Sequence, residues 1–228
     1  MTTLQRMTYD DLLATPDDRH LIGPGEQGSV GLQYDDLLAT PDDRHLYELV
    51  RGEILRMPPP NQDHGTIEAS LLEVMGRYLY ARARELGWNE GQGFGPRDLL
   101  VGRIDSGEAA ARFALPDDPD QMRGLDVCYL TPEQVVRALE SCAGTPILGV
   151  PALCVEVISA SEGAVYINQK LADYLAGGAQ LVWLVYPRTR TVQVHRADGS
   201  GQLLDGTASL DGAAVLPGSS VPLASLFT

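Results

Sequence analysis

The chain of 228 residues carries 31 Asp and Glu against 17 Lys and Arg, which gives a formal net charge of -14 at pH 7. This charge argues against non-specific binding of nucleic acid, because phosphate affinity comes from clusters of Lys and Arg. A hydrophobic content of 44% is ordinary for a globular protein with one large or two small domains. No apolar run approaches the ~18 residues needed to cross a membrane, so we expect a cytoplasmic protein without a membrane partner.

The N-terminal region contains a repeated segment: residues 9–21 and residues 34–46 both read YDDLLATPDDRHL. This identity indicates a local tandem duplication, in which each copy predicts a short helix that begins with acidic residues and ends before a proline. The second copy runs directly into the next predicted strand, so we expect it to occupy the native position in a domain of residues 34–228. Residues 1–33 then form an extension. We expect its surplus first copy to dock on a neighbouring subunit of a homodimer or to remain mobile.

Periodicity and turn residues predict alternating strands and helices through the rest of the chain. Before the centre they predict a hairpin at 47–57, a helix at 65–86, short strands at 98–101 and 110–115, and a loop at 116–123. After it they predict strands at 125–130, 153–158 and 181–186, helices at 132–141 and 163–176, and shorter strands at 191–195, 202–204 and 213–216. The order of strand, helix and strand in this second part predicts an α/β fold with a mixed sheet flanked by helices.

Two acids stand in short apolar runs that are typical of buried strands. Asp126 lies in the run LDVCYL, and Glu156 lies in the run LCVEVI. A buried carboxylate without a partner is costly, so two of them in central strands predict a shared counter-charge. A divalent metal ion is the simplest counter-charge of this kind.

Lysine usage singles out one further residue. Lys170 is the only lysine among 17 basic residues, and the other 16 are arginines. A compact ammonium that approaches a phosphate and an attacking water is not replaced by a planar guanidinium. The use of a single lysine at this position therefore suits a catalytic role, although a surface lysine on a helix is the plain alternative.

The order of several short segments resembles the PD-(D/E)xK nuclease superfamily and, within it, a bacterial family named putative restriction endonucleases. The segments are YELVRGE at 47–53, Met57 with three prolines, His64, Asp126, VEVIS at 155–159, Lys170, and VWLV at 182–185. Three positions depart from the motif. Leu125 stands in place of a proline, Ile158 in place of a lysine, and Tyr166 where relatives often carry an aspartate.

The resemblance implies a restriction-endonuclease-like core whose acids and lysine meet at one edge of the sheet. It implies metal-dependent hydrolysis of phosphodiester bonds in DNA, with Mg²⁺, or Mn²⁺ as a substitute, held by Asp126, Glu156 and the Val157 carbonyl. Lys170 would stabilise the developing charge. Glu48 and His64 are further candidates for the site.

Plain alternatives stay open for these candidates and for the activity. Glu48 could be an exposed acid on an edge hairpin, and His64 could cap or pack at the start of a helix. Arg77 and Arg84 share a helical face that could meet phosphate or simply be solvated. A decayed site at Tyr166 would instead leave a non-catalytic dimeric interaction protein or a regulatory metal-binding protein.

Overall fold

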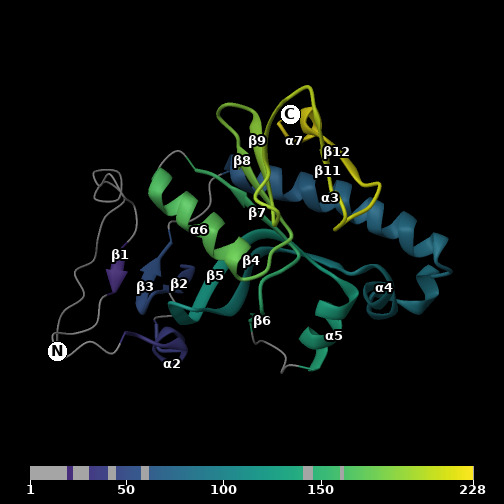
Figure 1. Ribbon diagram of the computed structural model, residues 1–228. Helices are drawn as coiled ribbons and strands as arrows, with labels where there is room; N and C mark the ends of the chain where they lie inside the picture. Colours follow the sequence, from purple (N-terminus) through teal and green to yellow (C-terminus); the bar gives the residue numbers. More distant parts are fainter. Residues whose placement is uncertain are drawn as a thin grey trace.

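The computed structural model describes residues 20–22, 31–40, 45–57, 62–140, 146–159 and 162–227. The fold is α/β, with a large mixed sheet flanked by helices, as the sequence predicts (Figure 1). Among the described residues the sheet runs in the order β1-β3-β2-β5-β7-β8-β9-β10, with β4 paired to β5 and β6 paired to β4. Parallel pairing of β7 with β8 lies next to antiparallel pairs, which makes the sheet mixed.

The strands of this sheet are β1 (His20–Ile22), β2 (Tyr47–Val50), β3 (Glu53–Arg56), β4 (Arg103–Leu115), β5 (Asp118–Leu130), β6 (Ile147–Leu148), β7 (Leu153–Val157), β8 (Leu181–Tyr186), β9 (Thr191–Arg196) and β10 (Gly201–Asp205). A small second sheet pairs β11 (Ser209–Asp211) with β12 (Ser220–Pro222). The helices are α2 (Tyr34–Leu38), α3 (Gln62–Glu85), α4 (Phe94–Val101), α5 (Pro132–Glu140), α6 (Ala164–Ala176) and α7 (Leu223–Leu226), with a 3-10 turn at Glu90–Gln92.

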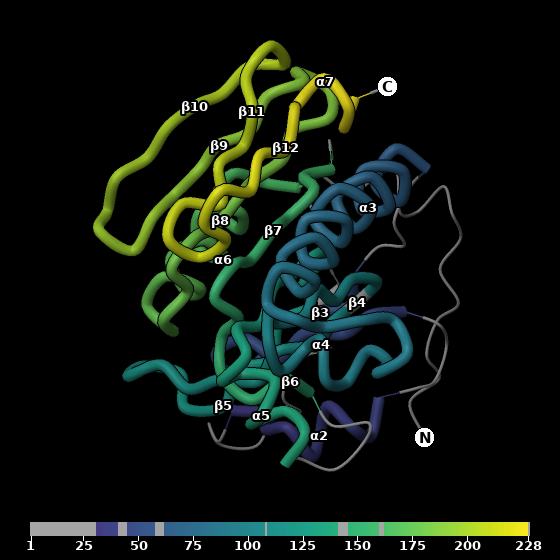
Figure 2. Tube along the Cα trace, turned by 90° about the vertical axis from the view of Figure 1, so that its right-hand side faces the viewer, coloured from purple at the N-terminus to yellow at the C-terminus, as the bar shows by residue number. Residues whose placement is uncertain are grey.

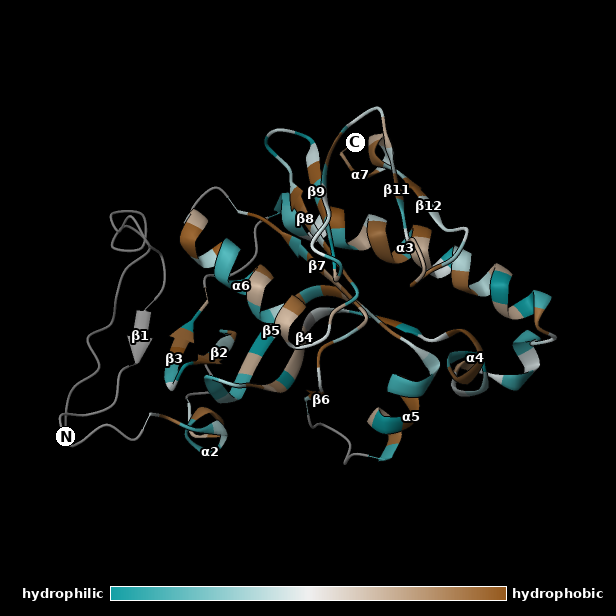
Figure 3. Cartoon of the chain, viewed as in Figure 1, coloured by the Kyte–Doolittle hydropathy of each residue, from teal (hydrophilic) through white to brown (hydrophobic). Residues whose placement is uncertain are grey.

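Helices α3 and α6 lie on opposite faces of the central strands (Figures 1 and 2), and an apolar core lies beneath each of them. The α3 core joins Leu71 and Met75 to alternate residues of β7 and β8, such as Val155. The α6 core joins Ile167 to the intervening residues, such as Cys154. Figure 3 shows apolar and polar residues along both helices, as expected for helices with one buried face. Because side chains alternate along β7, Glu156 shares its face with Cys154 and points toward α6.

The predicted elements are confirmed at the hairpin 47–57, at the long helix and at the strand, helix, strand order from 125 to 204, with shifts of a few residues. Three predictions are wrong. Residues 98–101 form the end of α4 and not a strand, and Gly93 and Gly102, both with positive φ, bound this helix. The prediction failed because a short apolar run does not distinguish a helix from a strand. Residues 118–123 continue β5 rather than forming a loop, because they pair with β4.

The strand predicted at 213–216 is the third error. Val215 and Leu216 donate backbone hydrogen bonds to the Gly212 carbonyl in a turn, and the strands lie on either side of it, in β11 and β12. The helix of the second repeat copy is confirmed as α2. The helix predicted in the first copy lies outside the described residues. Within the part of the chain that the structure describes, no helix is long and apolar enough to cross a membrane.

Candidate active site

Asp126 lies in β5 opposite a β-bulge in β4. Ser106 pairs with Val127 and Ala109 pairs with Leu125, so one extra residue of β4 stands across from Asp126. Gly107 in this bulge has a φ of 68°, a left-handed conformation that glycine adopts without strain. Bulges locally bend a strand and redirect its side chains. Asp126 reaches the neighbouring strand, where its Oδ2 accepts a hydrogen bond of 2.6 Å from the Val157 N–H.

A second contact of Asp126 creates a cluster with two residues of α3. His64 Nε2 lies 3.1 Å from Asp126 Oδ1 and 3.0 Å from Glu68 Oε1. One ligand atom from each residue lies within 4.8 Å of the others, which suits a metal ion. Burial disfavours the charged imidazole, but hydrogen bonds to Asp126 and Glu68 outweigh it and raise the pKa of His64 to about 10. The cluster thus holds two carboxylates and one imidazolium near neutral pH.

Lys170 is buried in α6 between two carboxylates. Its Nζ donates a hydrogen bond of 2.6 Å to Glu156 Oε2 and lies 3.3 Å from Glu48 Oε1. Burial disfavours the ammonium, but Glu156 and Glu48 outweigh it and hold the pKa of Lys170 well above its usual value. Burial raises the pKa of Glu156 to about 8, although the Lys170 ammonium acts in the opposite direction. The lysine therefore stays charged, and Glu156 is the member of this pair that takes up a proton.

The other oxygens of these carboxylates bind two tyrosines. The Tyr174 hydroxyl donates a hydrogen bond of 2.6 Å to Glu156 Oε1. The Tyr166 hydroxyl donates one of 2.5 Å to Glu48 Oε2. Tyr166, Lys170 and Tyr174 follow one another at intervals of one helical turn, so they project from the same face of α6. This face presents the ammonium and both hydroxyls to the acids of β2 and β7.

Arg123 extends the network from Glu48 to Asp173. This fully buried residue of β5 donates hydrogen bonds of 2.9 Å to Glu48 Oε2 and 2.5 Å to Asp173 Oδ2. Asp173 also accepts a bond of 3.1 Å from Arg51 in the β2–β3 turn. The three carboxylates of this network are matched by three cations: Glu48, Glu156 and Asp173 against Lys170, Arg123 and Arg51. The network is therefore neutral when every member is charged.

The predicted site residues fall into two adjoining groups. Glu48, Glu156 and Lys170 are in direct contact, and Glu48 is fully buried rather than exposed. Asp126 and His64 form the second group. The groups meet at β7, where Val157 follows Glu156 and its N–H binds Asp126. Asp126 also acts to raise the pKa of Glu156.

Sequence reasoning missed four residues of these groups: Glu68, Arg123, Asp173 and Tyr174. Glu68 follows His64 by four positions on a predicted helix, and this spacing could have indicated a shared face. Asp173 likewise follows Lys170 by three positions. Arg123 gave no such signal, because it stands in a polar segment that predicts a loop.

Comparison with known proteins identifies the family. The sequence profile of Uma2, described as putative restriction endonuclease, matches residues 33–224. The chain belongs to the Uma2 family. Its fold resembles the crystal structure of a putative nuclease from Anabaena variabilis ATCC 29413, with a TM-score of 0.66 and 17% identity over 86% of this chain and 97% of that one. A search of curated proteins gives no match. The Uma2 match includes the second repeat copy, and the first copy lies before it.

Proposed function

We propose that this Uma2 chain hydrolyses phosphodiester bonds in DNA with a metal-dependent site of the PD-(D/E)xK type. The observation that carries the proposal is the position of Lys170. The sole lysine of the chain is held as a buried ammonium at 2.6 Å from Glu156, and Glu156 precedes the residue whose N–H binds Asp126. An ammonium placed beside Glu156, whose strand β7 pairs with the strand β5 of Asp126, can stabilise charge that develops on a phosphate.

The donors around Asp126 fit a divalent cation. Two carboxylates lie about equally far from the same imidazole nitrogen, at 3.0 and 3.1 Å, and this nitrogen can donate only one proton. A cation would satisfy all three groups at once. Carboxylates suit Mg²⁺ and Mn²⁺, and imidazole is a ligand of transition-metal ions. Asp126, Glu68 and His64 would hold the cation, with Glu156 and the Val157 carbonyl as the further ligands that the family resemblance implies.

Each residue of the candidate site then has a defined role. A divalent cation held at Asp126 would supply Lewis-acid polarisation of the scissile phosphate. Lys170 keeps its proton and provides positive charge to the same group. Glu48 and Tyr174 orient this part of the site, Glu48 by contact with the Lys170 ammonium and Tyr174 by its bond to Glu156. Arg123 neutralises Glu48 and so leaves the ammonium available to Glu156.

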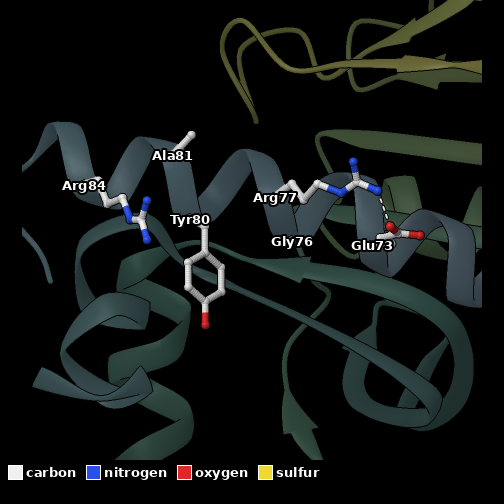
Figure 4. Close-up of a pocket in the computed structure, with 6 residues that line it drawn as sticks. All are labelled: Glu73, Gly76, Arg77, Tyr80, Ala81 and Arg84. Atoms are coloured by element: carbon white, nitrogen blue, oxygen red, sulfur yellow. Dashed lines mark hydrogen bonds and ion pairs between the residues drawn. The ribbon is translucent and has the colours of Figure 1, made fainter. Parts of the chain in front are cut away.

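The acidic surface limits how DNA would be bound. A hollow of about 530 Å³ along α3 is lined by two arginines and Tyr80 (Figure 4). However, Arg77 is paired with Glu73, and Arg84 is paired with Glu90. These arginines are therefore neutralised, and they offer little attraction to phosphate. We expect weak DNA binding without a divalent cation and tighter binding in its presence, because the cation would offset the negative charge of the acids.

Cleavage of supercoiled plasmid DNA tests the proposal. The wild-type protein should nick or linearise the plasmid with Mg²⁺ or Mn²⁺ and not with EDTA. Lys170→Arg, Asp126→Asn and Glu156→Gln should each abolish this activity while the protein remains folded by circular dichroism. Arg77→Met, on the exposed face of α3, is the matched control and should keep full activity. Unchanged cleavage by any of the first three variants would remove that residue from the mechanism.

One observation favours a non-catalytic alternative. Tyr166 donates its hydroxyl to Glu48, so the carboxylates of this network are bound by side chains of the protein without a metal ion. Such a site could serve binding alone, as an interaction or regulatory protein that works as a homodimer. Calorimetric titration with Mn²⁺, combined with the plasmid assay, distinguishes the nuclease from the non-catalytic protein. Binding without cleavage at any divalent cation would favour the alternative.

A further inference from the structure

The second copy of the repeat occupies a docking site whose walls lie outside the repeat. We define this docking site by Leu49, Ile54, Arg112, Asp120 and Met122. The Tyr34 N–H donates a hydrogen bond of 2.8 Å to Asp120 Oδ2, and the Arg112 guanidinium lies 4.2 Å from the centre of the Tyr34 ring. Leu37 is 4% exposed and packs in the same apolar cluster as Leu49, Ile54 and Met122.

The end of the second copy also contacts residues outside the repeat. The Leu46 carbonyl accepts a hydrogen bond of 2.8 Å from the Met57 N–H. The Leu46 side chain covers Gly124 so closely that a Cβ atom at that position would overlap Leu46 Cδ2. Gly124 precedes Asp126 by two residues in β5. The second copy therefore packs directly behind the strand that carries the candidate metal ligand.

The first copy offers the same chemical groups to the same walls. Its Tyr9, Leu12 and Leu21 correspond to Tyr34, Leu37 and Leu46, with no difference across the repeated segment. Two identical segments have equal intrinsic affinity for one docking site. What distinguishes them is the length of chain that connects each of them to β2.

The end of the first copy already lies near the docking site. β1 contains His20 and Leu21 of the first copy and pairs with one edge of β3, and β2 pairs with the other edge (Figure 1). His20 and Tyr47 stand opposite the same residue, Arg56. Two strand spacings separate them, which is about 10 Å. This proximity favours an exchange within one chain.

We propose that the two copies are alternative occupants of one docking site, and that the first copy replaces the second within the same chain when the second cannot bind. In the exchanged state Leu21 covers Gly124, and residues 22–46 form a loop that returns to Tyr47. Closing this loop lowers the conformational entropy of the chain, by a factor in the equilibrium constant that grows as the 3/2 power of loop length. Because the second copy needs no such loop, it is favoured by roughly a hundredfold. The docking site of each chain is already filled, so exchange between chains fills no additional one.

The test shifts the balance with Leu37→Asp, which places a charge at a buried position of the second copy. Hydrogen exchange with mass spectrometry distinguishes the copies, because their flanking residues give peptides of different mass. In Leu37→Asp the peptide of the second copy should lose protection, and the peptide of the first copy should gain protection relative to wild type. The folding equilibrium constant should fall by no more than about a hundredfold, since the first copy then fills the docking site. Leu37→Ala is the milder variant if Leu37→Asp does not fold.

Leu12→Asp is the matched control, because it makes the same change at the equivalent position of the first copy. It should leave exchange in the second copy and the folding equilibrium unchanged. Leu37→Asp should exceed the hundredfold limit when it is combined with Leu12→Asp, or when it is made in a chain from which residues 9–33 are excised, because no intact copy then remains. Equal losses with and without the first copy would overturn the proposal. So would a gain of protection that appears only with dimer formation in light scattering, because the exchange would then run between chains.

Discussion

Arg123→Met tests whether the buried charges around Glu48 balance one another. Methionine keeps much of the apolar volume of Arg123 but removes its charge, and it leaves Glu48 and Asp173 without their shared cation. Removing one partner of a buried ion pair costs about 3 to 5 kcal/mol, because the remaining charge is uncompensated. Glu48 keeps Lys170 at 3.3 Å and Asp173 keeps Arg51 at 3.1 Å. We therefore expect the lower end of this range, about 3 kcal/mol.

Urea denaturation at pH 7, followed by circular dichroism, measures this loss in the free energy of unfolding. Arg51→Met is the matched control, since Arg51 binds the same Asp173 but its side chain is 37% exposed. Exposed pairs contribute about 0 to 1 kcal/mol, so the two variants should differ by about 2 kcal/mol or more. Adding Glu48→Gln to Arg123→Met should recover part of the loss. A loss below about 1 kcal/mol for Arg123→Met would refute the charge-balance argument.

Three further predictions follow from other parts of the molecule. Burial acts to raise the pKa of Glu48 and of Asp173, but their cations outweigh it and hold both below the usual range. The free energy of unfolding that these ion pairs contribute is therefore present above the pKa of the two carboxyls in the unfolded state, and it is lost as the pH falls through their lower pKa in the folded state. A constant urea midpoint from pH 7 to pH 3 would contradict this. Gly102→Ala should lower the melting temperature more than Gly87→Ala, because both have positive φ but only at Gly102 would the added Cβ overlap neighbouring atoms. Mn²⁺ affinity should rise with pH from 7 to 9, because the pKa of His64 is raised to about 10 and the bound cation displaces that proton. In calorimetry His64→Gln should weaken this dependence, and the remainder comes from Glu156, whose pKa is raised to about 8.

The acids and the lysine were predictable because their signals are local. Asp126 and Glu156 stand out within apolar runs of six residues, and Lys170 stands out by composition alone. The partners that neutralise them were not predictable. Arg123 and Asp173 are 50 positions apart, and Arg123 and Glu48 are 75 apart. Such pairs depend on how β2, β5 and α6 pack together, and no local pattern encodes that packing.

The segment before Asp126 shows why polarity misled the loop prediction. Gln121 and Arg123 are polar residues of β5 and are fully buried. Gln121 donates a hydrogen bond of 2.9 Å to Asp173, the same carboxylate that Arg123 binds. Polar residues in a strand normally indicate a solvated face, but here they face a carboxylate contributed by a helix. The strand exists because of its ladder with β4 and its buried polar partners, and both are tertiary features.

Glu156 is the residue on which the nuclease and the non-catalytic alternative differ most. Both of its oxygens accept hydrogen bonds of 2.6 Å, from Lys170 and Tyr174, and burial raises its pKa to about 8. A cation beside Asp126 would add positive charge near this carboxyl and lower its pKa. Metal binding and ionisation of Glu156 therefore favour each other, so a closed network is the expected resting form of a metal-free nuclease. The hydrogen bonds around Glu156 therefore do not distinguish the proposed nuclease from the alternative, and Tyr166, which contacts Glu48 rather than Glu156, leaves this coupling intact.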